Sequence, residues 1–384
     1  MARCWGAAAA RAPAPPLPGS LGARGGGCAI GGTLAPSTCQ GAAGRRQGRR
    51  ALAAFGGADA GGGGVGGGGG AAEPGGGGDF EAPWAVALKL MSSPMGTVVG
   101  GVPIWVGAAL AFSESRQFSA GRLLATYTAA VLVMGWLNLS NDAYDAETGV
   151  DVEKHESVVT RTGNKGAILW LAYTSLLAGA ALFGALAAYL GDMRIPALLG
   201  SAVGVGYMYQ APPFRFSYMG LGEPMTVLAF SLSTTCFYLV QATVPGAPPA
   251  VFTPLVTASA LLVGATTAII LLCSHFHQET VDRNAGKKSP IVRLGTERAA
   301  GVLVACVIGV YAATMLLITA GVLPLACAAV LPLTFGRARS LINLVNDFHA
   351  VPQRIKPLKL LAAKWHSAFG LSFSAGVLWH AFTA

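Results

Sequence analysis

Nine apolar segments, each about as long as a bilayer is thick, dominate the chain from residue 94 onward. They lie near residues 94–112, 120–141, 166–190, 195–210, 224–243, 251–274, 300–319, 322–341 and 363–382. A membrane-spanning helix needs about 20 mostly apolar residues. Only 11% of the residues are charged, against about 25% in soluble domains. The sequence therefore predicts an all-α integral membrane protein, a bundle of about nine transmembrane helices over residues 79–384. We expect a lipid bilayer around it and no nucleic-acid partner.

The basic residues test this arrangement, because nine spans place alternate loops on opposite sides of the membrane. Of the 19 Lys and Arg after residue 78, sixteen fall on the side of the N-terminal flank. Only Arg116, Arg122 and Arg194 fall on the other side. Such a bias is typical of membrane proteins. The sixteen are Lys89, Lys154, Arg161, Lys165, Arg215, Arg283, Lys287, Lys288, Arg293, Arg298, Arg337, Arg339, Arg354, Lys356, Lys359 and Lys364.

Residues 1–78 differ in composition from the rest of the chain. Residues 1–58 carry seven Arg and no acidic residue, and residues 61–78 hold 13 Gly. Without apolar residues to bury, such a segment is expected to be disordered. An Arg-rich, acid-free start is typical of an organelle transit peptide, although a merely low-complexity tail stays open. This stretch alone does not decide between a chloroplast and a mitochondrion. The plastid transit peptide, the Gly-rich linker and the chloroplast membrane (thylakoid or inner envelope) that we expect rest on the family resemblance described below.

Acidic residues gather where the second apolar segment ends. Six of them fall between Asp142 and Glu156. Asn141 and Asp145 are four residues apart and share one face of a helix, with Asn138 one turn away. Carboxylates are costly near a bilayer and are usually functional there.

A second polar cluster follows the sixth apolar segment and lies on the same, basic side. It runs from Ser274 to Pro290, and Gln278 and Asp282 are again four apart. His275 and His277 could suggest zinc, but no further His or Cys has ligand spacing, so packing or a hydrogen bond to a carboxylate is the better interpretation. Two clusters of oxygen donors beside basic residues favour Mg²⁺ that bridges to a diphosphate. A single charged loop would more simply be a solvated surface.

Both clusters resemble motifs of the UbiA superfamily of intramembrane prenyltransferases. Asn141-Asp142-x-x-Asp145-x-x-x-Gly149-x-Asp151 is similar to its first Asp-rich motif, and Asp282-x-x-x-Gly286-Lys287-x-Ser289 to its second. The segments at 209–215 and 220–223 look like the branch that prenylates naphthoquinone precursors. Ser-His-Phe-His-Gln at 274–278, with the segment at 286–296, looks most like the cyanobacterial and plastid members that phytylate naphthoate. The second motif often reads Asp-x-x-x-Asp, whereas Gln278 stands first here, so either Gln278 or Glu279 could be the ligand.

The resemblance implies a fold, a reaction and a set of roles. The fold is a UbiA-type bundle that binds Mg²⁺. The reaction transfers a phytyl chain from phytyl diphosphate to 1,4-dihydroxy-2-naphthoate (2-carboxy-1,4-naphthoquinone) with loss of CO₂, in phylloquinone synthesis. Asp142, Asp145 and Asp282 are the expected catalytic residues. The expected metal ligands are Asn141, Asp142, Asp145, Asp151, Gln278, Glu279 and Asp282. The expected substrate-binding residues are Asn138, Lys154, Arg161, Tyr209, Arg215, Lys287 and Arg293, with Tyr144 as a further candidate.

Other functions stay open from the sequence. Within the superfamily, the acceptor could be homogentisate or chlorophyllide, or the tail could be longer, as in menaquinone synthesis. A secondary transporter would place its acidic residues near the bilayer midplane, whereas here both clusters lie at segment ends. A non-catalytic lipid- or quinone-binding protein would release no diphosphate.

Overall fold

The structure, a computed structural model, describes residues 80–91, 94–148 and 157–384. The chain divides into two units, Met1–Glu73 and Pro74–Ala384, and all described residues belong to the second. The predicted transit segment and linker, as well as Asp151 and Lys154, lie outside the described residues.

Nine long helices form the described part of the chain, which contains no strand. They are α2 (Pro94–Ser115), α3 (Ala120–Thr148), α5 (Lys165–Leu190), α6 (Arg194–Gln210), α7 (Gly222–Ala242), α8 (Pro254–His275), α11 (Thr296–Thr319), α12 (Val330–Phe348) and α14 (Leu358–Thr383). All except α6 and α14 meet the length and hydropathy of a membrane span, with η2 included in the α12 span. The predicted all-helical bundle of about nine spanning segments is confirmed.

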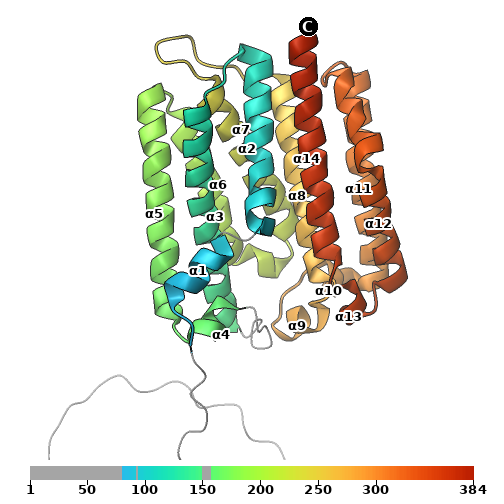
Figure 1. Cartoon of the computed structure of the whole chain (residues 1–384). Coiled ribbons are helices and arrows are strands. Elements are labelled where there is room, and N and C mark those ends of the chain that lie inside the picture. The colour runs from blue at the N-terminus through green and yellow to red at the C-terminus, as the bar shows by residue number, and fades with distance from the viewer. Residues whose placement is uncertain (1–79, 92–93, 149–156) are drawn as a thin grey trace, which may run out of the picture. The chain divides into compact units, whose positions relative to one another are not determined.

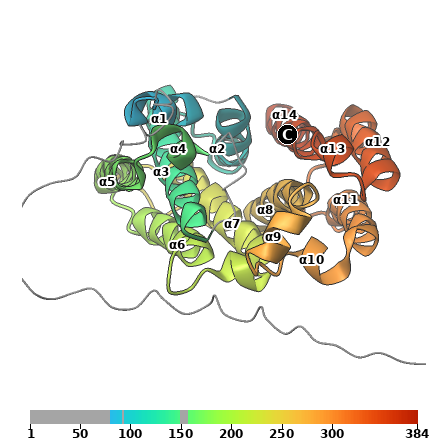
Figure 2. The ribbon, with the colours of Figure 1, turned by 90° about the horizontal axis from the view of Figure 1, so that it is seen from below.

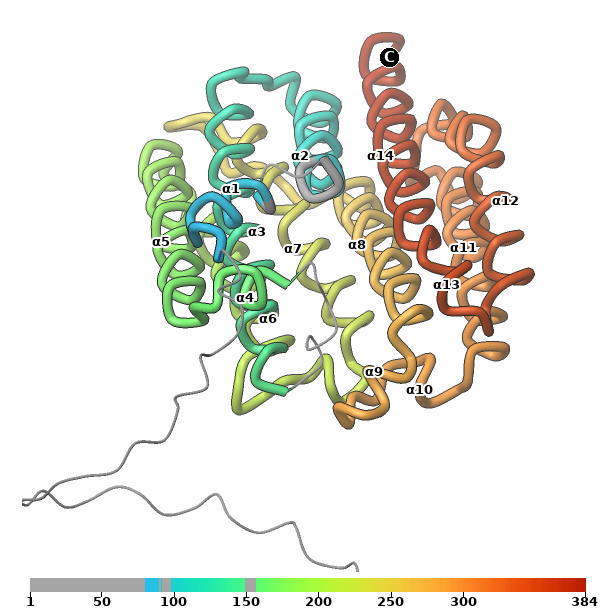
Figure 3. Tube along the Cα trace, turned by 60° about the horizontal axis from the view of Figure 1, so that its bottom comes forward, coloured from blue at the N-terminus to red at the C-terminus, as the bar shows by residue number. Residues whose placement is uncertain are grey.

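Short helices connect the long ones. They are α1 (Pro83–Met91), α4 (Val158–Thr162), η1 (Phe216–Met219), α9 (Glu279–Asn284), α10 (Pro290–Leu294), η2 (Leu325–Ala329) and α13 (Pro352–Ile355). The long helices run side by side, and α4, α9, α10 and α13 all lie at one end of them, the lower end in Figure 1. The first and last long helices, α2 and α14, pack against each other, as the view from below shows (Figure 2). Helix α1 runs obliquely across α3 (Figure 3).

Local sequence signals set several helix ends. Thr253 caps α8 by accepting from Val256 N, and Pro254 occupies the first turn, where its missing N–H costs nothing. Asn164 caps α5 in the same way through Ala167 N. The side-chain oxygens satisfy backbone donors that a helix start leaves unpaired.

Helices α7 and α8 approach each other closely because α8 carries Gly264 at the contact. A Cβ at this position would lie 2.4 Å from the backbone oxygen of Val227. Small residues allow such close packing in membranes, where no hydrophobic effect drives helices together. The contact fixes two walls of the cavity described below.

The few basic residues that the sequence places on the other side of the membrane lie at the end of the bundle opposite α4 and α9. Arg122 Nη1 donates to the backbone oxygens of Val240 and Thr243, at 3.0 and 2.7 Å. Arg194 Nη1 donates to Ala250 O at 2.7 Å. These contacts join the loops at the upper end of Figure 1. The predicted split of basic residues has one exception: Arg337 and Arg339 lie inside α12 and not in the loop after it.

Asp192 accepts several hydrogen bonds at this end of the bundle. Its Oδ1 accepts from the backbone N and Nε of Arg194, at 3.0 and 2.9 Å. Its Oδ2 accepts from Arg194 Nη2 at 2.7 Å and from Thr243 Oγ1 at 3.1 Å. The hydrogen bonds from Arg194 hold the pKa of Asp192 below its ordinary value.

We expect Asp192→Asn to destabilise the protein by about 1.5–3 kcal/mol at neutral pH, as hydrogen bonds to a charged group are lost. A depressed folded-state pKa gives stability that is present above the unfolded pKa, near 3.9, and lost as pH falls through the folded value. The difference between wild type and variant should therefore shrink below about pH 4. Thermal unfolding in detergent across pH measures it, and a pH-independent difference would contradict the ionic role of Asp192.

Candidate functional site

A cavity of about 330 Å³ lies between the long helices α3, α6, α7 and α8, and its wall includes residues from the ends of α3 and α8 that lead toward α4 and α9. Polar side chains from both predicted motifs line it. They are Asn138, Asn141 and Asp145 from the first motif region, and Ser274, His275, Gln278 and Lys287 from the second. Tyr209, Gln210, Thr226 and Lys359 add further polar groups. The chain thus brings together two segments that lie 129 or more residues apart.

The first motif supplies one helical face. Asn138, Asn141 and Asp145 recur at intervals of three and four along α3, which places them on the same side of the helix. All three line the cavity. Asp145 is only 8% exposed, and its Oδ1 accepts a hydrogen bond from the Tyr218 hydroxyl at 2.9 Å.

The second motif supplies a fully buried carboxylate. Asp282 in α9 has no exposed surface. Its Oδ2 lies 3.0 Å from His275 Nδ1, and its Oδ1 lies 3.7 Å from Lys287 Nζ. Burial alone would raise the pKa of Asp282, but the hydrogen bond to His275 and the Lys287 charge hold it below the ordinary value, so the carboxylate is ionised at neutral pH. The predicted hydrogen bond between a histidine and a carboxylate is confirmed for His275.

Tyr218 in η1 joins the two motifs. Besides its bond to Asp145, its hydroxyl lies 2.6 Å from Thr148 Oγ1, and its backbone oxygen accepts from Lys288 N at 2.8 Å. Its ring lies 5.6 Å from Lys287 Nζ. Burial, together with the Asp145 charge, raises the pKa of Tyr218, so the hydroxyl keeps its proton and can donate.

Gly220 makes this junction possible. It adopts φ +74°, a conformation that L-residues with side chains rarely adopt. A Cβ here would lie 2.4 Å from Lys288 O. Any larger residue would push η1 away from the second motif.

The donor set fits a hard divalent cation. Asp145, Asp282, Asn141 and Gln278 offer carboxylate and amide oxygens, the ligands that Mg²⁺ prefers. Asp282 does not itself line the cavity; its Oδ1 is buried and accepts no hydrogen bond, and the Lys287 ammonium lies 3.7 Å from it. Over the described ranges, no three His, Cys, Asp or Glu are grouped closely enough to hold a metal by themselves. A cation at this cavity would therefore depend on the amide oxygens and on the substrate itself.

Two predicted ligands face away from the cavity. Asp142 Oδ2 accepts from Ser157 Oγ and from Val159 N, each at 3.0 Å, and so ties α3 to the start of α4. Glu279 pairs with Arg283 one helical turn later, with Oε1 2.7 Å from Nη2. Their metal-binding roles stay predictions.

Three predicted phosphate- or acceptor-binding arginines have protein partners. Arg161 Nε donates to Glu81 Oε1 at 2.7 Å. Arg215 shares Glu147 with Lys165, and Arg293 donates to the backbone oxygen of Met219. None of the three arginines lines the cavity, and their substrate-binding roles stay predictions.

The sequence analysis did not assign a site role to Tyr218 or Lys359. Tyr218 lies between two segments that were singled out, 209–215 and 220–223, and its position there was the available signal. Lys359 was counted only as a basic residue, yet α14 brings it to the cavity wall. Its sequence distance from both motifs gave no indication of this contact.

An apolar cavity borders the polar one inside the bundle. A second cavity of about 80 Å³ shares Met134, Leu137, Gly206, Ala229 and Phe230 with the first. Its other walls include Pro103, Trp136, Phe183, Leu199 and Phe237.

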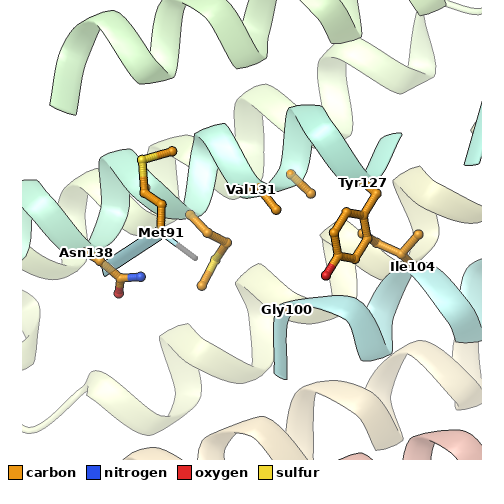
Figure 4. Close-up of a pocket in the computed structure, with 9 residues that line it drawn as sticks. Met91, Gly100, Ile104, Tyr127, Val131 and Asn138 are labelled. Atoms are coloured by element: carbon orange, nitrogen blue, oxygen red, sulfur yellow. The ribbon is translucent and has the colours of Figure 1, made fainter. Parts of the chain in front are cut away.

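A third, small cavity of about 20 Å³ lies between α1, α2 and α3. Figure 4 shows it extending along α3 between the Asn138 amide and the Tyr127 ring, with Met91 and Ile104 in the wall. Asn138 and Met134 line both this cavity and the polar one.

Comparison with known proteins shows which family has this architecture. The sequence model of the UbiA prenyltransferase family matches residues 101–353. The 2-carboxy-1,4-naphthoquinone phytyltransferase of Synechocystis is 36% identical over 297 residues, which cover 77% of this chain and 93% of that protein. The chloroplastic enzyme of the same name from Arabidopsis thaliana is 38% identical over 278 residues, 72% of this chain and 73% of that protein.

A solved structure shows the same fold. A UbiA homologue from Archaeoglobus fulgidus, bound to DMAPP and Mg²⁺, matches with a TM-score of 0.51 at 15% identity. The match covers 75% of this chain and 99% of that one.

Proposed function

The chain belongs to the UbiA prenyltransferase family, and from this premise we propose that it transfers a phytyl chain to a naphthoate acceptor. The donor is phytyl diphosphate and the acceptor is 1,4-dihydroxy-2-naphthoate, the two-electron-reduced form of 2-carboxy-1,4-naphthoquinone. The names of the two relatives support this assignment. The observation that carries it is the cavity lined by residues of both motif regions, with an apolar cavity beside it.

We propose that Asn141 and Asp145 hold one Mg²⁺ and that Asp282 and Gln278 hold another. Asp151, outside the described residues, is proposed to assist the first ion. The Mg²⁺ supplies Lewis-acid stabilisation of the charge that develops on the leaving diphosphate. Tyr218 and His275 orient Asp145 and Asp282 through the hydrogen bonds described above, as partners of metal ligands commonly do.

Two lysines are placed to bind the diphosphate directly. Lys287 and Lys359 line the cavity, so a diphosphate held there would meet both ammonium groups. Arg161, Arg215 and Arg293 keep a role in attracting the anion, and Lys154 is proposed to join them.

The bond changes follow from the substrates. The C–O bond between the allylic carbon and the diphosphate breaks, and its electron pair leaves with the diphosphate. The ring carbon that carries the carboxylate forms the new C–C bond, and the carboxylate then leaves as CO₂. Tyr209 and Asn138, which line the cavity, are proposed to orient the ring.

The apolar cavity beside the site favours a long prenyl tail. Its walls, including Trp136, Phe183 and Phe237, are buried apolar side chains. Each buried CH₂ of a tail contributes about 0.8 kcal/mol. The same walls exclude water, which would otherwise capture the allylic cation.

A plastid membrane is the proposed location, with residues 1–78 as transit peptide and linker. The chloroplastic relative supports this assignment, as does the Arg-rich, acid-free start of the chain.

The test is an assay of the full-length protein in nanodiscs, with phytyl, geranylgeranyl and solanesyl diphosphates against dihydroxynaphthoate and homogentisate. We expect phytyl transfer to dihydroxynaphthoate with equal release of diphosphate and CO₂, and loss of turnover on metal removal by EDTA that Mg²⁺ restores. Preferred transfer to homogentisate would contradict the acceptor assignment. Full activity after metal removal would contradict the metal assignment while leaving the acceptor assignment intact.

A further inference from the structure

Helix α12 exposes charged side chains on the outer surface of the bundle. Its buried face consists of Val330, Thr334, Ala338, Leu341 and Val345, and it packs on α14 and α11. Figures 1 and 2 show α12 at the edge of the bundle. The exposed side chains on its outer side include Arg337, Arg339, Ser340 and Asn343.

Two contacts with α11 fix the depth of the arginines. The Tyr311 hydroxyl lies 2.6 Å from Thr334 Oγ1, and Thr296 Oγ1 lies 3.1 Å from His349 Nδ1. Both contacts give the same antiparallel register.

In this register Arg337 is level with Ile308 and Arg339 with Cys306, near the middle of α11. At 1.5 Å per residue, both arginines are about 15–20 Å from either end of that helix. Arginines near helix ends reach the headgroup region with their side chains, whereas both of these arginines lie far from either end of α11.

The arginines lack an ionic partner within the described part of the chain. Arg337 Nη1 donates weakly to Leu333 O at 3.4 Å, and no ion pair involves Arg339. Exposed side chains around them include Leu333, Phe335 and Ile308, which are 60%, 62% and 56% exposed. A charge at mid-depth is costly against lipid, and such residues almost always pair with another group.

We propose that the outer face of α12 binds a different membrane protein, whose transmembrane helix presents an Asp or Glu at mid-depth. Charge complementarity requires an acidic partner. A carboxylate and a guanidinium pair through strong charge-assisted hydrogen bonds. Gly336 and Ser340, one turn apart on the exposed side, allow a helix to approach closely.

A second copy of this chain does not fit the face. Two copies with the same membrane orientation would place Arg337 and Arg339 against their own equivalents, which repel. Over the described ranges, every carboxylate lies in a connection or within about two turns of a long helix's end. Examples are Glu114, Glu223, Glu297 and Asp347. No described carboxylate of a second copy is therefore available at mid-depth.

The test uses a designed probe. A fluorescent Leu-rich 22-residue transmembrane peptide with one central Glu is reconstituted in lipid vesicles with the full-length protein, labelled at a C-terminal tag. Energy transfer measures association. We expect the Glu peptide to associate at least 10-fold more tightly than otherwise identical Gln and Leu peptides. The double variant Arg337→Leu/Arg339→Leu should lose this preference while keeping wild-type prenyl transfer, which verifies folding.

Matched controls separate the alternatives. Arg298→Leu makes the same change at an exposed arginine near the end of α11 and should retain the preference. Equal association of the Glu and Leu peptides would overturn the proposal. So would a preference that the double variant retains. If anionic lipid competes the Glu peptide away, the arginines serve lipid headgroups, and the proposal is equally overturned.

Discussion

Alanine at Asp145 or at Asp282 is expected to lower prenyl transfer by about a thousandfold or more. Both carboxylates are buried: Asp145 lines the cavity from α3, and Asp282 in α9 contacts His275 and Lys287, which line it. Removing a single group that stabilises developing charge costs about 10²–10³ in rate, and here the variant would also lose a ligand of the proposed Mg²⁺. The two variants should therefore lose prenyl transfer to a similar extent, although 137 residues separate the two positions.

The variants must be distinguished from misfolded protein. Asp282→Ala leaves His275 and Lys287 without their acceptor, so Asp282→Asn, which keeps the size of the side chain, is the more informative change. Asp347→Ala removes an exposed carboxylate at the end of α12 and serves as the matched control. Single-turnover diphosphate release and thermal unfolding are measured for each. Near-normal release from folded Asp145→Ala or Asp282→Asn would refute the site.

The sequence predicted the bundle well because its signal is repeated along the chain. Each span is a long apolar segment, and the nine helices follow those segments closely. The cavity-facing side of α3 was also predictable, since Asn138, Asn141 and Asp145 recur at helical spacing and all line the cavity. Periodicity is local information, and it was sufficient for both results.

The contacts of Asp142 could not be predicted from its position in the sequence. It is adjacent to Asn141, and successive residues point about 100° apart around a helix, so it faces elsewhere. Only the position of α4 reveals that its carboxylate accepts from Ser157 and Val159.

Long-range ion pairs could not be predicted from the sequence for a related reason. Arg161 meets Glu81 and Arg215 meets Glu147 across 80 and 68 residues. No sequence spacing encodes these partners, because packing alone brings them together. The α12 arginines were misplaced for another reason: they interrupt the apolar pattern of the segment at 322–341 and were counted with the loop after it, whereas α12 continues past them to Phe348.

Lys287 and Lys288 offer a comparison between neighbouring residues of the same type. Lys287 is 7% exposed and lines the cavity, whereas Lys288 is exposed and lies outside it. We expect Lys287→Met to lower kcat by about 10²–10³, because a buried ammonium beside the leaving diphosphate stabilises charge in a site from which water is excluded. Lys288→Met should stay within about twofold of wild type, as surface substitutions usually change little.

The kinetic pattern identifies what Lys287 does. If its ammonium stabilises the departing diphosphate, kcat and kcat/KM should fall together, since the interaction strengthens in the transition state. A rise in KM with unchanged kcat would mean that Lys287 only binds the donor. Lys287→Met also removes the cation beside Asp282 Oδ1, at 3.7 Å, so thermal unfolding with Mg²⁺ is the check on folding. Equal losses in the Lys287 and Lys288 variants would show that general positive charge, and not the buried position, supports the reaction.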